Sequence, residues 1–60
     1  MFSAEEKYKC ALRELRLRRR VYPRWVDAGR MLRATAAHEI EVMLEIVEDY
    51  AKKAKEERLV

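Results

Sequence analysis

The sequence predicts an all-α fold: a helical hairpin with a short middle helix, associating as a homodimer into a four-helix-type bundle. Glycine and proline occur once each among the 60 residues, and charged residues reach 42%, a composition typical of long helices. Apolar residues recur at helical spacing in two separate segments. Length allows a single domain, and one cysteine excludes an internal disulfide. So small a chain therefore needs a partner to complete its core.

The first helix is predicted over about residues 4–21. Ser3 and Glu6 form the two ends of a capping box, in which each side chain bonds the other's free backbone N–H. The helix should end near Val21, because Pro23 pushes Tyr22 out of the α region.

Two apolar stripes run along this first helix. One is predicted to face the last helix, whereas the other lies more than a third of a turn away, so a single hairpin partner cannot cover both. Wide apolar surface of this kind favours association with a second copy. The first stripe contains Tyr8, Ala11, Leu12, Leu15 and Tyr22, and the second contains Cys10, Leu17 and Val21.

A short middle helix is predicted over about residues 23–28. Pro23 suits a first helical turn, and Gly29 suits the left-handed position that ends a helix. Trp25 is expected to plug the end of the helical core, with stacking on a base or ligand as the alternative.

The last helix is predicted over about residues 32–57. Its apolar residues follow the 4-3-4-3-4 spacing of a heptad seam: Ala36, Ile40, Met43, Val47, Tyr50 and Ala54. The connector of about ten residues leaves open whether the hairpin is closed or domain-swapped. The residues expected in the core and dimer contact are Tyr8, Leu12, Leu15, Trp25, Ile40, Met43, Val47 and Tyr50.

Charge is divided unevenly along the chain. Residues 1–33 hold ten Lys and Arg against four acids, whereas residues 34–60 hold four against seven. The basic first helix either pairs with the acids of the last helix, such as Glu41, Glu45 and Glu48, or faces water and binds phosphates. The candidate contact residues for nucleic acid or a partner are Lys9, Arg13, Arg16, Arg18, Arg19, Arg20 and Arg24.

The stretch Arg18-Arg19-Arg20-Val21-Tyr22-Pro23-Arg24-Trp25-Val26, with Gly29-Arg30-Met31, Glu39-Ile40, Met43 and Asp49-Tyr50 after it, resembles a family of small uncharacterised proteins. That family is associated with proteobacterial genomes and their phages. The resemblance covers about residues 12–50 and implies no catalytic residue. The chain departs from the family at Leu32, where relatives carry Thr, and at Thr35, where relatives carry an acid. The first departure weakens the expected N-cap of the last helix.

Few side chains of the types that bind metals or act in catalysis occur in the sequence. One histidine and one cysteine cannot build a zinc site, and no nucleophile stands at a useful spacing from a base. We therefore expect no enzyme activity, no cofactor, no small-molecule substrate and no membrane span, and the unpaired cysteine suits the cytoplasm. The function expected is that of a small non-enzymatic, homodimeric interaction module, and the resemblance implies a relation to phage or prophage proteins. The alternative is a small nucleic-acid-binding accessory protein that uses the basic first helix.

Overall fold

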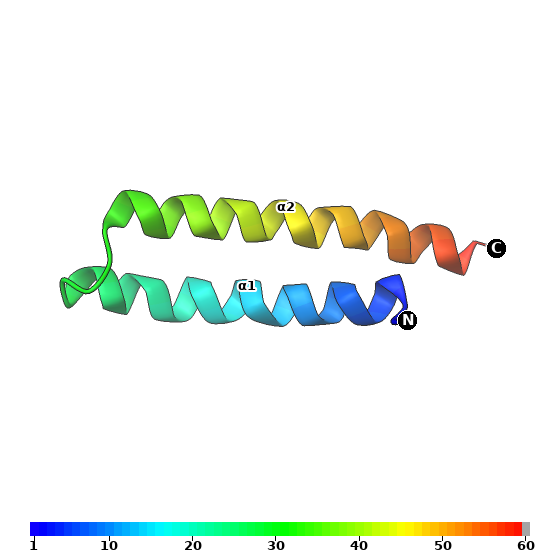
Figure 1. The fold of residues 1–60 in the computed structure, drawn as a ribbon, viewed down its shortest axis with the longest axis horizontal. Helices are drawn as coiled ribbons and strands as arrows, with labels where there is room; N and C mark the ends of the chain where they lie inside the picture. Colours follow the sequence, from blue (N-terminus) through cyan, green and yellow to red (C-terminus); the bar gives the residue numbers. More distant parts are fainter. Residues whose placement is uncertain (60) are drawn as a thin grey trace.

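The chain forms a hairpin of two antiparallel helices in the computed structural model, which describes residues 1–59 (Figure 1). Helix α1 spans Ala4–Asp27 and helix α2 spans Arg33–Arg58. The molecule is 47 Å long, its two helices lie side by side, and the start of α1 and the end of α2 lie at the end opposite the loop. The predicted all-α hairpin is confirmed, and within the single chain it is closed.

Helix α1 begins at the predicted cap. The Ser3 side chain accepts a hydrogen bond from the Glu6 backbone N–H at 3.1 Å. The capping box predicted the Glu6 carboxylate as the acceptor at this helix start, whereas the carboxylate that accepts a backbone N–H here is that of Glu57. The backbone N–H of Ala4 donates to both carboxylate oxygens of Glu57 at 3.2 Å each. The end of α2 thus stabilises the positive end of the α1 dipole.

The predicted separate middle helix is wrong, because α1 continues through Pro23 to Asp27. Proline in a helix removes one backbone hydrogen bond, here to the carbonyl of Arg19, and crowds that carbonyl. Pro23 is exposed and lies little more than one turn from the helix end, so water can reach the freed carbonyl. The continuous helix also stacks the rings of Tyr22 and Trp25, whose centroids are 5.5 Å apart.

The end of α1 is set by Gly29, as predicted. Gly29 has a φ of 74°, a left-handed conformation that costs glycine little. The N–H of Gly29 donates to the Val26 carbonyl at 3.0 Å, and the N–H of Arg30 donates to the Trp25 carbonyl at 2.8 Å. These two bonds form a Schellman motif. The motif ends α1 at Asp27, six residues beyond the end predicted near Val21.

Helix α2 matches its predicted range to within one residue at each end. Its N-cap, Leu32, makes no side-chain capping bond, as the departure at that position implied. The heptad seam is confirmed as the face toward α1: Ala36, Met43, Val47 and Ala54 are buried, and Ile40 and Tyr50 are half-buried.

The core is thin. Ala11, Leu15, Met43 and Val47 form its buried cluster, with Leu15 only 2% exposed. The remaining predicted core residues lie around this cluster at different depths. Tyr8, Leu12, Ile40 and Tyr50 are half-buried.

The predicted plug of the core by Trp25 is wrong, since this side chain is 42% exposed. A plug required the chain to turn at Pro23 and fold over the end of the hairpin. The helix instead runs straight on, so the indole projects from the flank of α1. Trp25 therefore lies at the surface, and the alternative of stacking on a base or ligand stays a prediction.

Candidate interaction surfaces

The basic residues of α1 form one exposed face, which we call the basic face. It consists of Lys9, Arg13, Arg16, Arg20 and Arg24, all of them exposed. At about 100° per residue these five lie on the side of α1 opposite the buried Ala11 and Leu15. The face is about 22 Å long at 1.5 Å per residue.

The basic face does not pair with α2. Among residues 1–59 the ion pairs join Arg18 to Glu14 at 3.0 Å and to Glu39 at 3.9 Å. The acids Glu41, Glu45 and Glu48 are exposed on α2. The hypothesis that the first helix pairs with the acids of the last helix therefore holds for Arg18 alone. The outer side of α1 is basic and the outer side of α2 is acidic.

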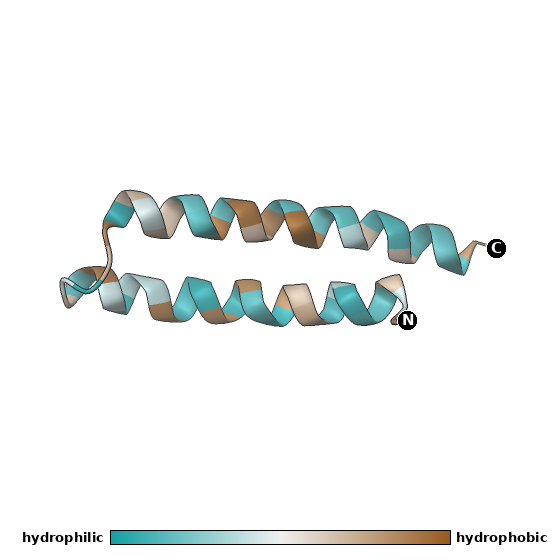
Figure 2. Ribbon diagram, viewed as in Figure 1, coloured by the Kyte–Doolittle hydropathy of each residue, from teal (hydrophilic) through white to brown (hydrophobic). Residues whose placement is uncertain are grey.

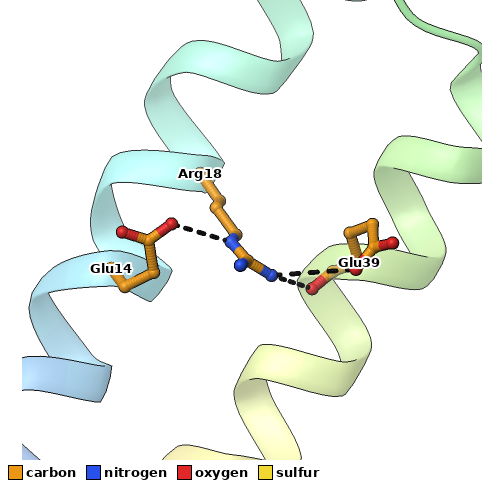
Figure 3. Close-up of polar contacts among 3 residues, drawn as sticks. All are labelled: Glu14, Arg18 and Glu39. Carbon is orange, nitrogen blue, oxygen red and sulfur yellow. Dashed lines mark hydrogen bonds and ion pairs between the residues drawn. The ribbon is translucent and has the colours of Figure 1, made fainter.

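Arg18 has a different environment from the other arginines, which the sequence analysis did not detect (Figure 3). Its side chain is 22% exposed, and its guanidinium points across to α2, where it donates to the backbone carbonyl of Glu39 at 2.9 Å. The sequence contains a pattern that places Arg18 on the face of α1 toward α2. Ala4, Tyr8, Ala11, Leu15, Arg18 and Tyr22 follow the same 4-3-4-3-4 spacing as the α2 seam.

Arg18 divides the hairpin into two unlike edges. The edge on its side carries the charged Glu14, Arg18 and Glu39 among apolar side chains, so charge interrupts its groove. The opposite edge, which we call the apolar edge, carries a row of half-buried or exposed apolar residues with a small hollow near the loop end. The apolar edge consists of Tyr8, Leu12, Val26, Ala37, Ile40 and Leu44.

The rim of the apolar edge is charged. Arg19 is exposed on α1 between Leu12 and Val26, at the angle that helical spacing gives it. On α2, Glu41 and Glu48 flank the same edge and are exposed. Arg19 thus belongs to the apolar edge and not to the basic face.

The second apolar stripe of α1 stays uncovered in the single chain. Leu17 is 41% exposed, and Val42, from the neighbouring flank of α2, is 39% exposed. Figure 2 shows hydrophobic segments on the side of α1 that points away from α2 as well as on the side that faces it. The prediction that one hairpin partner cannot cover both stripes is confirmed.

An aromatic corner lies near the loop end of α1. Leu17, Val21 and Trp25 follow one another at four-residue spacing beside the basic face, and Tyr22 stacks on Trp25 with ring planes 28° apart. The Arg18 guanidinium lies 5.8 Å from the Tyr22 ring centroid. These side chains and Glu14 line a hollow of about 250 Å³.

Residues 1–59 contain no group of three metal-ligating side chains. No helix in that range is long and apolar enough to cross a membrane. The free thiol of Cys10 is exposed on α1, where it accepts a weak hydrogen bond from Arg13 at 3.6 Å.

No protein family, curated protein or solved structure matches the chain. The family resemblance based on residues 18–26 therefore stays a prediction. The hairpin has three candidate interaction surfaces: the basic face, the apolar edge and the aromatic corner.

Proposed function

We propose that the protein is a non-enzymatic interaction module that acts as a homodimer, with two hairpins forming a four-helix bundle. The observation that carries this proposal is the size of its surface. The hairpin exposes 5063 Å², about 900 Å² more than the roughly 4,100 Å² expected for a compact protein of 7.2 kDa. A standard interface buries about 800 Å² on each partner. One second copy therefore matches the excess.

The apolar edge is the surface that the second copy covers. Leu12, Ile40 and Leu44 already pack against the core on one side and face outward on the other. Covering them removes apolar area from water without disturbing the hairpin, at about 25 cal/mol per Å². The opposite edge is a poorer contact, since Glu14, Arg18 and Glu39 interrupt its groove with charge.

Charge supports one arrangement of the two copies. With the two-fold axis parallel to the helices, α1 of each copy packs against α2 of the other, and neighbouring helices run antiparallel. Arg19 then faces the partner's Glu41, and Glu5 faces the partner's Lys55. An axis perpendicular to the helices instead puts the basic α1 against its own copy, which like charges oppose.

Sedimentation equilibrium at micromolar concentration tests the proposal. We expect a mass of twice 7.2 kDa. Ala37→Lys should give a folded monomer, because Ala37 is exposed in the hairpin and a lysine there puts a charge into the apolar edge. The matched control is Ala34→Lys, exposed on the outer side of the same helix, which should stay dimeric. A folded wild-type monomer at this concentration overturns the proposal.

The same proposal includes the cellular compartment of the protein and the kind of genome that encodes it. A chain with one free cysteine suits the cytoplasm, and the resemblance around Arg-Arg-Val-Tyr-Pro supports a bacterial or phage genome. No nucleophile is held against a base by any hydrogen bond among the described residues, which supports a binding role. The identity of the neighbouring genes tests whether the protein is encoded by a phage or prophage.

A further inference from the structure

Trp25 is the largest apolar side chain that the described part of the hairpin leaves exposed. Its indole is 42% exposed, although burying a tryptophan side chain is strongly favourable. Because α1 continues as a helix through Pro23, the Trp25 ring is held at this position. It stacks on the Tyr22 ring, and the two ring centroids are 5.5 Å apart. Arg18, bonded to Glu14 and to the Glu39 carbonyl, lies over the Tyr22 ring and fixes that ring in turn. The exposed indole is thus a preorganised flat surface.

The basic face and this indole lie on the same helix, on either side of a narrow apolar ridge. Arg24 precedes Trp25 in the chain and lies about 100° from it around the helix, and Arg20 lies five residues before it, about 140° around. Between the arginines and the indole lie only Leu17 and Val21, whose side chains make an apolar floor. A strand whose phosphates follow the basic face would therefore reach the indole only with a base that extends across this ridge.

We propose that this surface binds single-stranded nucleic acid, with the phosphates on the basic face and a nucleobase stacked on Trp25. Positive charge that tracks a backbone, together with aromatic rings for the bases, is the combination that proteins use for single strands. The hollow of about 250 Å³ beside Trp25 is below the 300 Å³ typical of a pocket for a whole drug-sized ligand. It suits one planar ring.

A duplex and a membrane surface fit these observations less well. The bases of a duplex are stacked inside it, so the indole would find no partner, and no side chain on the basic face offers a pattern that reads base edges. A membrane-surface helix needs a broad apolar face, whereas Leu17, Val21 and Trp25 form a single narrow ridge. The proposal goes beyond dimerisation and does not depend on it, because the basic face and aromatic corner lie outside the apolar edge.

Fluorescence of Trp25, the single tryptophan of the chain, gives a direct test. The full-length protein is titrated with oligo(dT) of about 16 nucleotides, with an abasic oligonucleotide of equal length, and with a duplex. We expect oligo(dT) to quench the tryptophan. The abasic strand should bind about tenfold more weakly, the loss expected on removal of a stacked base, and neither it nor the duplex should quench.

Two variants separate stacking from charge, with binding measured by anisotropy of a labelled oligo(dT). Trp25→Leu should weaken binding about tenfold and leave its salt dependence unchanged. Arg16→Gln with Arg20→Gln should lower the slope of log affinity against log salt by about 1.4, since each single-strand phosphate contact contributes about 0.7. Lys52→Gln with Lys53→Gln removes the same charge from α2 and should change neither quantity. Far-ultraviolet circular dichroism checks that each variant is folded.

Three results would overturn the proposal. The first is absence of oligo(dT) binding at about 50 mM salt. The second is equal affinity for the oligo(dT) and abasic strands, which would reduce the surface to a phosphate contact. The third is a blue-shifted Trp25 on vesicles of anionic phospholipid without quenching by oligo(dT), which would assign the surface to membranes.

Discussion

The backbone N–H of Ala4 donates to both carboxylate oxygens of Glu57, 53 residues further along the chain, at 3.2 Å each. This contact joins the first residue of α1 to the last turn of α2. It closes the end of the hairpin that has no covalent loop. The loop end is closed by the Schellman motif at Gly29, so both ends of the two-helix unit are fixed by backbone hydrogen bonds.

Removing the Glu57 carboxylate should loosen the open end. Glu57→Ala should lower the free energy of unfolding by about 0.5 kcal/mol, the usual value of a carboxylate at an exposed helix N-terminus. In a domain of this size that corresponds to a fall of about 3 °C in Tm. Glu56→Ala, one residue earlier and also exposed, should change Tm by less. Equal shifts for the two variants would contradict a specific role for Glu57.

Gly29 should tolerate substitution according to backbone conformation alone. A Cβ at this position meets no atom within 4 Å, so crowding contributes nothing. Its φ of 74° is the only obstacle. Gly29→Val should therefore cost about 1–2 kcal/mol and Gly29→Asn less. Chemical denaturation of the three proteins measures this order, and an equal cost for Asn and Val would refute it.

A charge in the core should unfold the hairpin. Val47 is 7% exposed and belongs to the buried cluster. Val47→Lys should cost several kcal/mol, because the buried ammonium has no partner. Glu45→Lys, two residues earlier on the outer side of α2, should be tolerated. Circular dichroism at 222 nm distinguishes the two, and a helical Val47→Lys variant would show that this position is not part of a core.

Arg18 should matter for stability, unlike the arginines of the basic face. Arg18→Ala should cost about 1–2 kcal/mol, since it removes a charged donor from the Glu39 carbonyl and from Glu14. Arg20→Ala deletes the same side chain from an exposed position and should cost less than about 0.5 kcal/mol. Thermal unfolding compares them. Similar costs would mean that the seam position of Arg18 has no energetic consequence.

The proposed dimer predicts that Arg19 and Glu41 form a charge pair between copies, which the two-fold axis repeats. Arg19→Glu should weaken dimerisation about fivefold, the effect of about 1 kcal/mol, and adding Glu41→Arg should restore it. Arg13→Glu, on the basic face, makes the same charge change as a control. Dissociation constants from sedimentation measure all three. If the double variant is as weak as Arg19→Glu, the two helices are paired differently.

The heptad spacing of α2 and the cap and turn residues allowed most of the hairpin to be predicted. Ser3, Gly29 and the seam from Ala36 to Ala54 act through local rules, so their sequence positions were sufficient. The position of Pro23 was not sufficient to predict the end of α1. Its preference against helix is modest near a helix end, and the Schellman motif and the stacked rings of Tyr22 and Trp25 outweigh it. As a result, Trp25 was predicted to be buried, whereas it is exposed.

The candidate surfaces were predictable in part. Helical spacing placed Lys9, Arg13, Arg16 and Arg20 on one stripe, and they do share one exposed side. Whether that stripe meets the acids of α2 depends on how the helices are rotated about their axes. Arg18 occupies a seam position, and its bonds to Glu14 and Glu39 use the charge pairing that composition alone had suggested for the whole helix.

The opposite charges on the two outer sides of the hairpin make each copy an electric dipole across its short dimension. A single copy approaching a polyanion is turned by that dipole until α1 leads. In the proposed two-fold pair the dipoles point in opposite directions and cancel, and the basic faces lie on opposite corners of the bundle. Such a pair cannot wrap both faces around one strand, but it can hold two strands, or two segments of one strand, at a distance set by the thickness of four helices.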